Sequence, residues 1–282
     1  MTSKRIGLLH PGEMGASIGA AARAAGTRVS WASAGRSDAS RRRAAEAGIE
    51  DAHTPAALAA RSDVIISVCP PEAARSVAES ILGTGFTGIF VDANAVSSTT
   101  ARDLASFVED ADAHFVDGGI IGPPACRKGT TRLYLSGAEA SSVASAFQGS
   151  PLEVVVIDPR PGAASALKMS YAAWTKGSAA LLTAIRALAQ AEGVEAALLE
   201  EWSLSKPGLE AQSAAGARSN AFKAWRFSGE MREIAATFEA SGLPGGFHRA
   251  AADIYQRLAG YKDCDSAPEL SEVIDAILAT RT

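Results

Sequence analysis

The sequence has few cysteines, no excess of positive charge and no long apolar run. Cys69, Cys126 and Cys264 lie far apart without a CxxC pair, which argues against a disulfide framework or zinc cluster and indicates a reducing, cytoplasmic setting. With 27 Lys plus Arg against 31 Asp plus Glu, the net charge is −4, which disfavours nucleic acid and anionic membranes as partners. The opening MTSKRIGLL has only a short apolar run, residues 6–9, too short for a signal-peptide core or a membrane span. No HExxH motif, paired carboxylates or Ser/His/Asp arrangement supports metal hydrolysis or acyl transfer.

The length and composition are those of an ordinary folded protein. The 282 residues are 47% hydrophobic and 21% charged, far from the composition of disordered chains. A domain commonly has about 100–200 residues. We therefore expect two domains.

In the first half, short β-type runs alternate with Ala-rich amphipathic stretches, the pattern of βαβ units in a parallel sheet. The predicted strands are 5–9, 28–32, 64–68, 89–92, 114–117, 132–136 and 152–157. The predicted helices between them are 14–25, 37–47, 71–82, 99–108 and 138–147. The pattern predicts a doubly wound α/β sheet with extra edge strands.

After the Pro/Gly cluster DPRPG, residues 158–162, the alternation stops and helix follows helix. The cluster predicts a domain boundary, which gives an α/β domain over 1–160 and an all-α domain over 161–282. Predicted helices are 163–192, 194–203, 209–217, 229–240, 246–258 and 267–279. The first would be about 45 Å long at 1.5 Å per residue, which suggests packing against a second subunit.

The segment IGLLHPGEMG, residues 6–15, follows the first predicted strand and opens the first predicted helix, as a dinucleotide-binding turn must. Gly12, with Glu13 and Met14 after it, would let the backbone approach a pyrophosphate, and Gly15 would let helix and strand pack. His10 replaces the first glycine of the GxGxxG pattern. The alternative is a purely structural turn between strand and helix.

The end of the second predicted strand bears on the choice of dinucleotide. An NAD-binding chain places a carboxylate there, but this sequence has WASAGRS over residues 31–37. Ser33, Arg36 and Ser37, with Arg41 nearby, offer donors and positive charge for a 2′-phosphate. We therefore predict NADP, with NADPH preferred over NADH. The alternative, a solvated helix start, suits Arg42 and Arg43 better.

Two further strand ends should face the same crevice, because ligands of open α/β sheets bind at the carboxyl ends of the strands. Cys69 and Pro70 follow one strand, and Asn94 follows the next. Asn94 is the better polar candidate, since Cys69 has no base beside it in the sequence and fits a buried filler.

Two glycine-rich stretches, 117–124 and 129–134, could bring backbone amides close to a carboxylate or another anion. The predicted substrate contacts there are Gly119, Ile120, Ile121 and Gly122. The glycines and prolines could equally shape an edge hairpin.

In the long helix, Lys168, Tyr171, Thr175 and Ser178 share one face at i, i+3, i+7 and i+10. A polar stripe in an Ala/Leu-rich helix indicates a wet cleft, where the lysine would give a proton to a carbonyl oxygen or accept one from a hydroxyl. Thr175 is a predicted substrate contact in the same cleft. The alternative is a lysine on an exposed helix face, as we expect for Lys176.

Among the histidines, His248 follows two glycines near a predicted helix start. It could reach a substrate pocket or serve only in packing. His53 and His114 have no ligand-like spacing and are predicted to be structural or surface residues.

The order of these motifs resembles the β-hydroxyacid dehydrogenase superfamily. The resemblance rests on a cofactor turn ending GEMG, a GxxxxxK motif over residues 162–168 and an all-helical second half. That superfamily includes 6-phosphogluconate and hydroxyisobutyrate dehydrogenases, with imine reductases as relatives. HPGEMG, VCPP, DANA, DGGIIGPP and GAASALKMSYAAWTKGSAAL are closer still to a bacterial subgroup with a phosphogluconate-dehydrogenase-like C-terminal domain.

The resemblance implies a Rossmann-type NADP domain, a helical domain that dimerises by embracing its partner, and an active site between the domains. It makes Lys168 the catalytic lysine. The sequence departs from the family at Ala172, where an asparagine is usual, and at residues 121–123, which align with a substrate-binding Ser-Gly-Gly.

Three hypotheses follow. The first is an NADPH-dependent reductase or dehydrogenase of a carbonyl or hydroxyl compound, with Lys168 as general acid or base and Tyr171 hydrogen-bonded to the same oxygen. The second is an imine reductase, against which Lys168 argues and for which the apolar Ile120–Ile121 stretch and Tyr171 argue mildly. The third is a non-catalytic NADP-binding sensor, which would not need the polar stripe.

Overall fold

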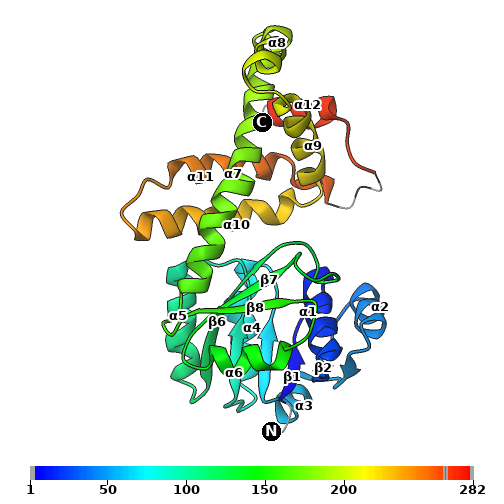
Figure 1. Ribbon diagram of the computed structural model, residues 1–282, viewed down its shortest axis with the longest axis vertical. Helices are drawn as coiled ribbons and strands as arrows, with labels where there is room; N and C mark the ends of the chain where they lie inside the picture. Colours follow the sequence, from blue (N-terminus) through cyan, green and yellow to red (C-terminus); the bar gives the residue numbers. More distant parts are fainter. Residues whose placement is uncertain (1–3, 263, 265, 280–282) are drawn as a thin grey trace. The chain divides into compact units, whose positions relative to one another are not determined.

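The computed structural model describes residues 4–262, 264 and 266–279 (Figure 1). The first three residues of the opening segment considered above lie outside the described part. The chain forms two compact units, one that runs to Met169 and one that begins at Ser170. The sequence-based boundary at 160/161 lies in the turn before a long helix that starts in the first unit and ends in the second.

The first unit contains an eight-stranded sheet in the order β3-β2-β1-β4-β5-β6-β7-β8. Every neighbouring pair is parallel except β6 and β7, which are antiparallel. The strands are β1 Arg5–Leu8, β2 Arg28–Trp31, β3 Glu50–Asp51, β4 Val64–Ser67, β5 Ile89–Asp92, β6 His114–Ile121, β7 Arg132–Ser136 and β8 Glu153–Asp158. The predicted Rossmann-type α/β class is confirmed.

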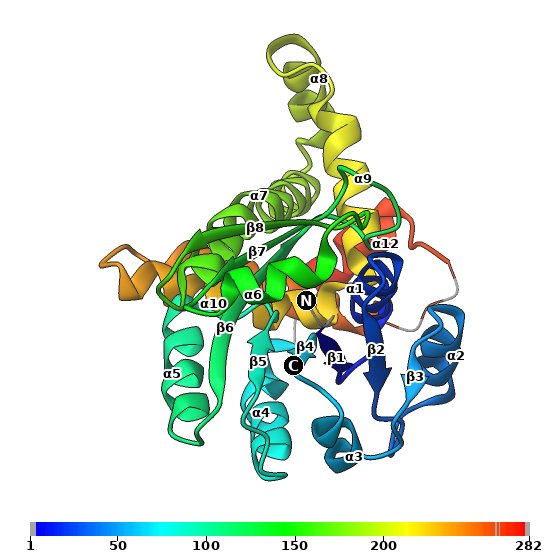
Figure 2. The same ribbon diagram turned by 60° about the horizontal axis from the view of Figure 1, so that its bottom comes forward.

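Helices cover both faces of this sheet (Figure 2). One buried cluster joins Ile18 of α1 and Val143 of α6 to the sheet, and the other joins Leu58 of α3, Ile81 of α4 and Leu104 of α5. The helices are α1 Glu13–Ala24, α2 Asp38–Glu46, α3 Pro55–Ala60, α4 Ala74–Leu82, α5 Ser98–Glu109 and α6 Ala140–Ala144, with 3-10 turns at Pro71–Ala73 and Ser145–Phe147. Strand residues alternate between the clusters, so both faces of the sheet are buried.

One predicted strand of this unit was too short, and two short elements were missed. The predicted strand 114–117 continues to Ile121, because residues 117–121 pair with β7. The sequence also gave no sign of β3 and α3, which are two and six residues long, too short for a periodic pattern. Thr54 caps α3 by accepting a hydrogen bond from the Ala57 amide (3.1 Å), and Pro55 stands in its first turn.

The second unit is helical, and the predicted all-α region is confirmed. Its helices are α7 Ala163–Ala191, which begins in the first unit, then α8 Glu195–Ser205, α9 Leu209–Ala221, α10 Ala224–Ala240, α11 Gly246–Arg257 and α12 Leu270–Leu278, with a 3-10 turn at Ala259–Tyr261. Buried Met231 and Ile234 of α10 and Tyr255 of α11 belong to its core. No helix in the described part of the chain is long and apolar enough to cross a membrane.

Lys176 is not the exposed lysine that its sequence context predicted. Its amine pairs with the Glu230 carboxylate of α10, and the two side chains are only 14% and 8% exposed. The Tyr255 hydroxyl donates to the Lys176 carbonyl oxygen (2.8 Å). A buried charge needs such a partner, since desolvation of an unpaired one is costly. Lys176 therefore ties α7 to the helices packed on it.

Candidate active site

Several predicted residues gather at one edge of the sheet in the first unit. β1, β4, β5 and β6 are parallel neighbours, so their carboxyl ends meet at the edge where ligands of such sheets bind. Gly12 follows β1, Cys69 follows β4 and Asn94 follows β5, while the Lys168 amine meets the end of β6.

The turn after β1 has the geometry that a dinucleotide needs. A Cβ on Gly15 would lie 2.1 Å from the His10 carbonyl oxygen, whereas a Cβ on Gly12 would meet nothing within 4 Å. Gly12 is the N-cap of α1, and no side chain in the described part of the chain caps the helix there. Glu13 is exposed and Met14 half-buried. The open backbone at Gly12 and the uncapped amides of α1 suit a pyrophosphate.

His10 stands where the pattern has its first glycine, and it is neutral at pH 7. Burial, and then the charge of Arg36, lower the pKa of its imidazole to about 4. His10 Nδ1 and Arg36 Nε are both buried, and neither has a hydrogen-bond partner within the described residues. A buried donor such as Arg36 Nε is costly to leave unpaired. The pair therefore fits a bound group that brings an acceptor, and a phosphate does so.

Ser33 is buried at the end of β2, and the loop after it is closed by its own contacts. The Ser33 carbonyl oxygen accepts hydrogen bonds from the Arg36 amide (3.1 Å) and from Arg41 Nη2 (3.0 Å). The Ser33 hydroxyl is hydrogen-bonded to the Asp51 carboxylate. Arg41 and Ser33 are thus engaged with protein groups, and Arg36 keeps a buried donor for a ligand.

Asp51 is a carboxylate at this edge that the sequence analysis missed. It comes from β3, which pairs Trp31 with Asp51. Burial acts to raise the pKa of Asp51, but hydrogen bonds from Ser33 and the His53 amide, with the charges of His53 and Arg41, outweigh it and lower the pKa. No sequence pattern could predict the position of Asp51, because a two-residue strand has no periodicity.

Asn94 and Cys69 lie together, as their strand ends predicted. Asn94 is 3% exposed, its Oδ1 accepts a hydrogen bond from the Cys69 amide (2.5 Å), and its Nδ2 donates to Ser67 Oγ (3.2 Å). Burial raises the pKa of the Cys69 thiol to about 11, so it is protonated and a poor nucleophile. Pro70 follows half-buried. Asn94 holds the two loops in place.

Of the two possibilities for the glycine-rich stretches 117–124 and 129–134, the structure has the hairpin. Residues 117–121 are strand and pair antiparallel with β7. Gly119 pairs with Tyr134 and Ile120 with Leu133, and the side chains of Ile120 and Ile121 are buried. A Cβ on Gly119 would lie 2.6 Å from the Ala164 carbonyl oxygen and 3.2 Å from Lys168 Cβ. Gly122 has φ +126°, and a Cβ there would lie 2.3 Å from the Thr130 carbonyl oxygen. The glycines permit close backbone packing.

Lys168 lies over this part of β6. Its Nζ donates to the Ile120 carbonyl oxygen (2.6 Å), and its side chain is half-buried. An amine held at the carboxyl edge of the sheet is placed to exchange a proton with a ligand bound there. No cluster of three or more His, Cys, Asp or Glu fit to hold a metal occurs among the described residues.

Comparison with known proteins agrees with this geometry. Residues 5–149, just over half of the chain, match the family described as the NAD binding domain of 6-phosphogluconate dehydrogenase. The chain belongs to this family. It is therefore a member of the 6-phosphogluconate dehydrogenase-like β-hydroxyacid dehydrogenase superfamily, as its motifs predicted. Residues 189–258 match a domain of unknown function, DUF1932.

The chain is similar to individual proteins at 20–32% identity. An uncharacterised 28.5 kDa protein of Methanothermus fervidus is 32% identical over 167 residues, 59% of this chain and 63% of its own length. A conserved protein of unknown function, whose structure is reported to resemble 3-hydroxyacid dehydrogenases, is 26% identical, with a TM-score of 0.66 over 92% of this chain and 99% of that one. The 3-hydroxyisobutyrate dehydrogenase of Mycobacterium tuberculosis, solved with L-serine, is 20% identical, with a TM-score of 0.69 over 99% and 100%.

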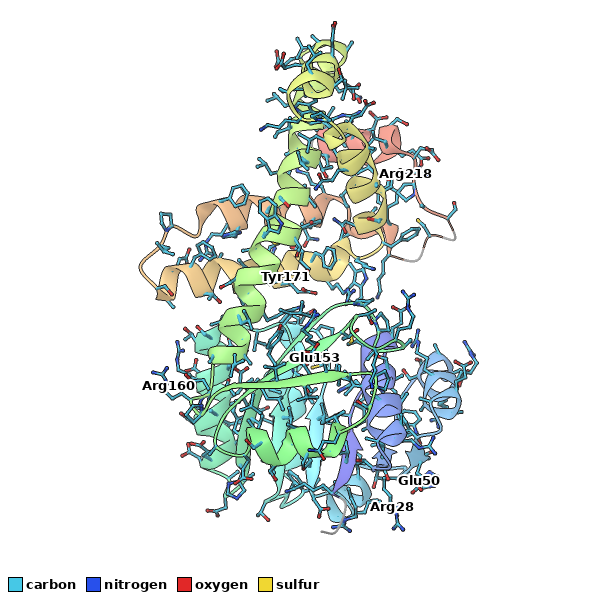
Figure 3. All side chains as sticks on the ribbon, viewed as in Figure 1. Arg28, Glu50, Glu153, Arg160, Tyr171 and Arg218 are labelled. Atoms are coloured by element: carbon cyan, nitrogen blue, oxygen red, sulfur yellow. The ribbon has the colours of Figure 1, made fainter. Side chains whose placement is uncertain are left out.

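In this 6-phosphogluconate dehydrogenase-like chain, Tyr171 and Thr175 belong to the second unit. Tyr171, labelled in Figure 3, is 48% exposed. Thr175 and Ser178 line a cavity of about 180 Å³ with Gln212 and Asn220 of α9. The last two members of the polar stripe, Thr175 and Ser178, thus border a small cavity in this unit. The roles of Tyr171 and Thr175 toward a substrate stay predictions.

His248 packs inside the helical unit. It is 5% exposed, and its ring centroid lies 4.3 Å from that of Phe238 and 5.1 Å from that of Phe247. Burial lowers its pKa. Of the two roles considered from the sequence, these contacts favour packing.

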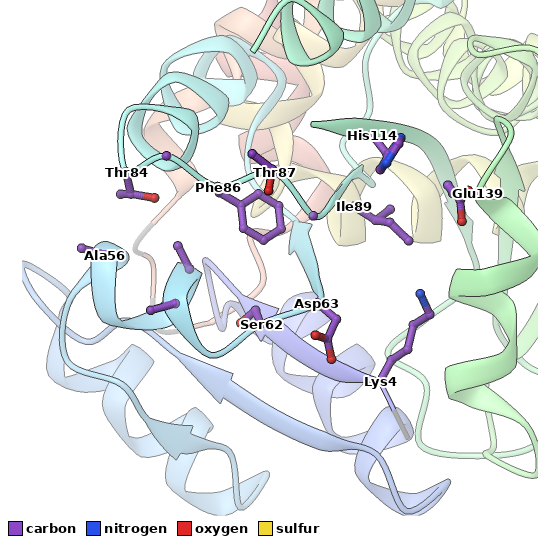
Figure 4. A pocket seen from close by; sticks show the side chains of 14 residues that line it. Lys4, Ala56, Ser62, Asp63, Thr84, Phe86, Thr87, Ile89, His114 and Glu139 are labelled. Atoms are coloured by element: carbon purple, nitrogen blue, oxygen red, sulfur yellow. The ribbon is translucent and has the colours of Figure 1, made fainter. Parts of the chain in front are cut away.

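A larger cavity, of about 590 Å³, lies at the opposite edge of the sheet (Figure 4). Lys4, Asp63 and His114, which line it, stand at or just before the starts of β1, β4 and β6. The Asp63 carboxylate is already paired with Arg5 (2.7 Å). Since ligands of such sheets bind at the carboxyl edge, we do not assign this cavity to the candidate site.

Proposed function

We propose that this protein is an NADP(H)-dependent oxidoreductase that transfers a hydride between nicotinamide and the carbon of a small carbonyl or hydroxyl compound. The observation that carries the proposal is Lys168 Nζ, 2.6 Å from the Ile120 carbonyl oxygen. It places an amine at the carboxyl edge of a sheet whose family binds a dinucleotide. Neither a sensor nor a structural domain needs a lysine there.

The nicotinamide supplies the hydride, and the residues of this chain bind, orient and move a proton. The open backbone at Gly12 and the first turn of α1 would bind the pyrophosphate. Asn94 holds the loops after β4 and β5 beside it. Lys168 would donate a proton to the carbonyl oxygen in reduction and accept one from the hydroxyl in oxidation.

Arg36 is the basis for proposing NADP rather than NAD. Its Nε is buried without a protein partner among the described residues, and a 2′-phosphate would supply an acceptor with opposite charge. Asp51 is nearby in β3, but its carboxylate is engaged by Ser33 and the His53 amide. We therefore infer that the positive charge determines the preference.

The cofactor assignment is tested by titration with NADPH and NADH, followed through the protein's tryptophan fluorescence. Arg36→Ala should weaken NADPH binding by about 10- to 100-fold, the effect of losing one charge-assisted hydrogen bond, and leave NADH binding within about threefold. Arg42→Ala, an exposed arginine in α2, is the matched control and should change neither. Equal losses for both dinucleotides would contradict the role of Arg36.

The role of Lys168 is tested with Lys168→Met, which keeps the apolar stem and removes the amine. We expect turnover to fall by about 10²–10⁴, the contribution of a positioned acid or base, with NADPH binding unchanged. Lys206→Met, at an exposed lysine, is the control. Turnover equal to wild type in Lys168→Met would remove the lysine from the mechanism.

The substrates to assay first are carbonyl compounds less polar than ordinary hydroxyacids, because Ile121, Gly122 and Pro123 stand where the family resemblance places a Ser-Gly-Gly. A panel of aldehydes, ketones, ketoacids and cyclic imines, each with NADPH, separates the alternatives. Oxidation of NADPH by cyclic imines alone would favour imine reduction. Tight NADPH binding with no turnover on any member would favour a sensor.

We further propose that the protein is a cytoplasmic homodimer. All three cysteines are free thiols, as a reducing compartment would keep them. On α7, Tyr171, Trp174, Leu181 and Leu188 form an exposed apolar stripe, here called the α7 seam, and are 45–73% exposed. An apolar stripe of this spacing fits a second helix of the same kind.

A further inference from the structure

The first turn of α7 has no cap of its own. The helix begins at Ala163, and the Ala166 amide donates to the Gly162 carbonyl oxygen (3.0 Å), which makes Gly162 the N-cap. An N-cap side chain normally accepts a hydrogen bond from the amide of the third helical residue. Glycine has no side chain, so another part of the chain must supply the acceptor.

The acceptor is Asp117, which comes from the middle of β6. Its Oδ2 accepts hydrogen bonds from the amides of Gly162 and Ser165 (both 2.9 Å), and its Oδ1 accepts one from Ser165 Oγ (2.5 Å). Asp117 is fully buried. A carboxylate at a helix N-terminus is also stabilised by the positive end of the helix dipole.

Ser136 of β7 completes the attachment. Its hydroxyl donates to Asp117 Oδ2 (2.9 Å) and accepts from the Ala164 amide (3.0 Å). Two residues further along β6, a Cβ on Gly119 would lie only 2.6 Å from the Ala164 carbonyl oxygen. The first turn of α7 therefore sits against β6, held by side chains of two strands.

Lys168 follows Ser165 by one turn of the helix. Its amine reaches Ile120, which follows Asp117 by three residues in β6. The two hydrogen-bonded attachments, at Asp117 and at Ile120, join the same short stretch of strand to the same first turns of the helix. A shift of the helix start would move the amine with it.

We propose that Asp117 is a positioning residue for Lys168: it replaces the missing N-cap of α7 and so fixes where the lysine amine lies on β6. The inference rests on the proposed role of Lys168. Asp117 is fully buried and bonded to the helix start, so it is not a group that would touch substrate or cofactor. It acts through the geometry of the first helical turn.

The test compares Asp117→Ala with Asp117→Asn in the full-length protein. The alanine removes every acceptor. The single side-chain oxygen of the asparagine can take the place of Asp117 Oδ2 and accept from the two amides, and its NH2 group can take the place of Oδ1 and face Ser165 Oγ. Two readouts need no turnover: hydrogen exchange of amides 162–166, and the acylation rate of Lys168 relative to Lys206, measured by mass spectrometry.

In Asp117→Ala we expect faster exchange in residues 162–166 and about tenfold faster acylation of Lys168, the factor for loss of roughly one hydrogen bond. Asp117→Asn should restore both to within about threefold. With a turnover assay in hand, kcat should fall in Asp117→Ala while KM and NADPH binding are unchanged. Thr54→Ala, which removes the cap of α3, is the matched control and should move none of these.

If Asp117→Ala does not fold, Ser136→Ala provides the same test, because it removes the acceptor for the Ala164 amide and should change both readouts less but in the same direction. Unchanged exchange and acylation in a folded variant would overturn the proposal. Changed exchange and acylation in a protein that oxidises no NADPH would support the positioning and overturn the proposed enzyme function instead.

Discussion

At the scale of single residues, the candidate site relies on groups whose ionisation the fold sets. His10 is the clearest example. A glycine there would add nothing to the electrostatics of the cofactor turn, whereas a buried imidazole beside Arg36 stays neutral, since its pKa is lowered to about 4. A neutral ring beside the turn adds no second positive charge next to that of Arg36. Because the folded state disfavours protonation of His10, this residue lowers the stability of the protein at low pH.

The free energy of unfolding should therefore depend on pH in a way that can be tested. The folded-state pKa of His10 lies near 4 and the unfolded value near 6.5, so between these values the unfolded chain binds more protons. The contribution of neutral His10 to the free energy of unfolding is therefore fully present above about pH 6.5. As the pH drops toward 4, the free energy of unfolding decreases, by about 3 kcal/mol at most. His10→Gln should flatten the decline in stability between about pH 6.5 and 4.5.

Urea unfolding followed by circular dichroism measures this directly. The internal control is the comparison above about pH 7, where His10 is neutral in both states and the difference between variant and wild type should be constant. Parallel curves over the whole range would show that His10 titrates alike in the folded and unfolded chains.

At the scale of elements, local patterns predicted most of the fold. β1, β4, β5 and α7 all lie within a residue or two of their sequence-based ranges, because strand alternation and helical periodicity are local properties. The carboxyl-edge residues Gly12, Cys69 and Asn94 could be found for the same reason. Each directly follows a strand or opens a helix.

What the sequence did not predict depends on pairing between distant segments. Residues 118–121 have the glycines of a loop but are strand, because β7 pairs with them. Asp51 reaches the end of β2 only through a two-residue strand, and Asp117 caps a helix that starts 46 residues later. A separation of 46 residues leaves no local sequence pattern that could reveal the contact. The attachment of Lys168 therefore required the structure.

At the scale of the whole molecule, α7 takes part in two different tasks. Its first two turns, in the first unit, carry Lys168, and its remaining length, in the second unit, carries the α7 seam. Leu181 and Leu188 are 45% and 62% exposed and seven residues apart. This repeat turns successive side chains toward one side of a helix.

The last prediction concerns assembly through the α7 seam. A second copy would bury the same side chains on both chains, as a twofold interface does. We expect wild type to sediment as a dimer and the double variant Leu181→Glu/Leu188→Glu to sediment as a monomer, because buried like charges would face each other. Each chain should keep its helical content, since both side chains are exposed in the single chain.

The matched control is Leu204→Glu, at a leucine of α8 that is 75% exposed and lies outside the α7 seam. It should leave the dimer intact. If Leu204→Glu dissociates the dimer and the seam variant does not, the dimer interface lies on α8 and not on the α7 seam. A wild-type protein that sediments as a monomer at about 50 μM, well above the Kd of a standard-size interface, would exclude a stable dimer and leave the exposed tryptophan and leucines of α7 to a different partner.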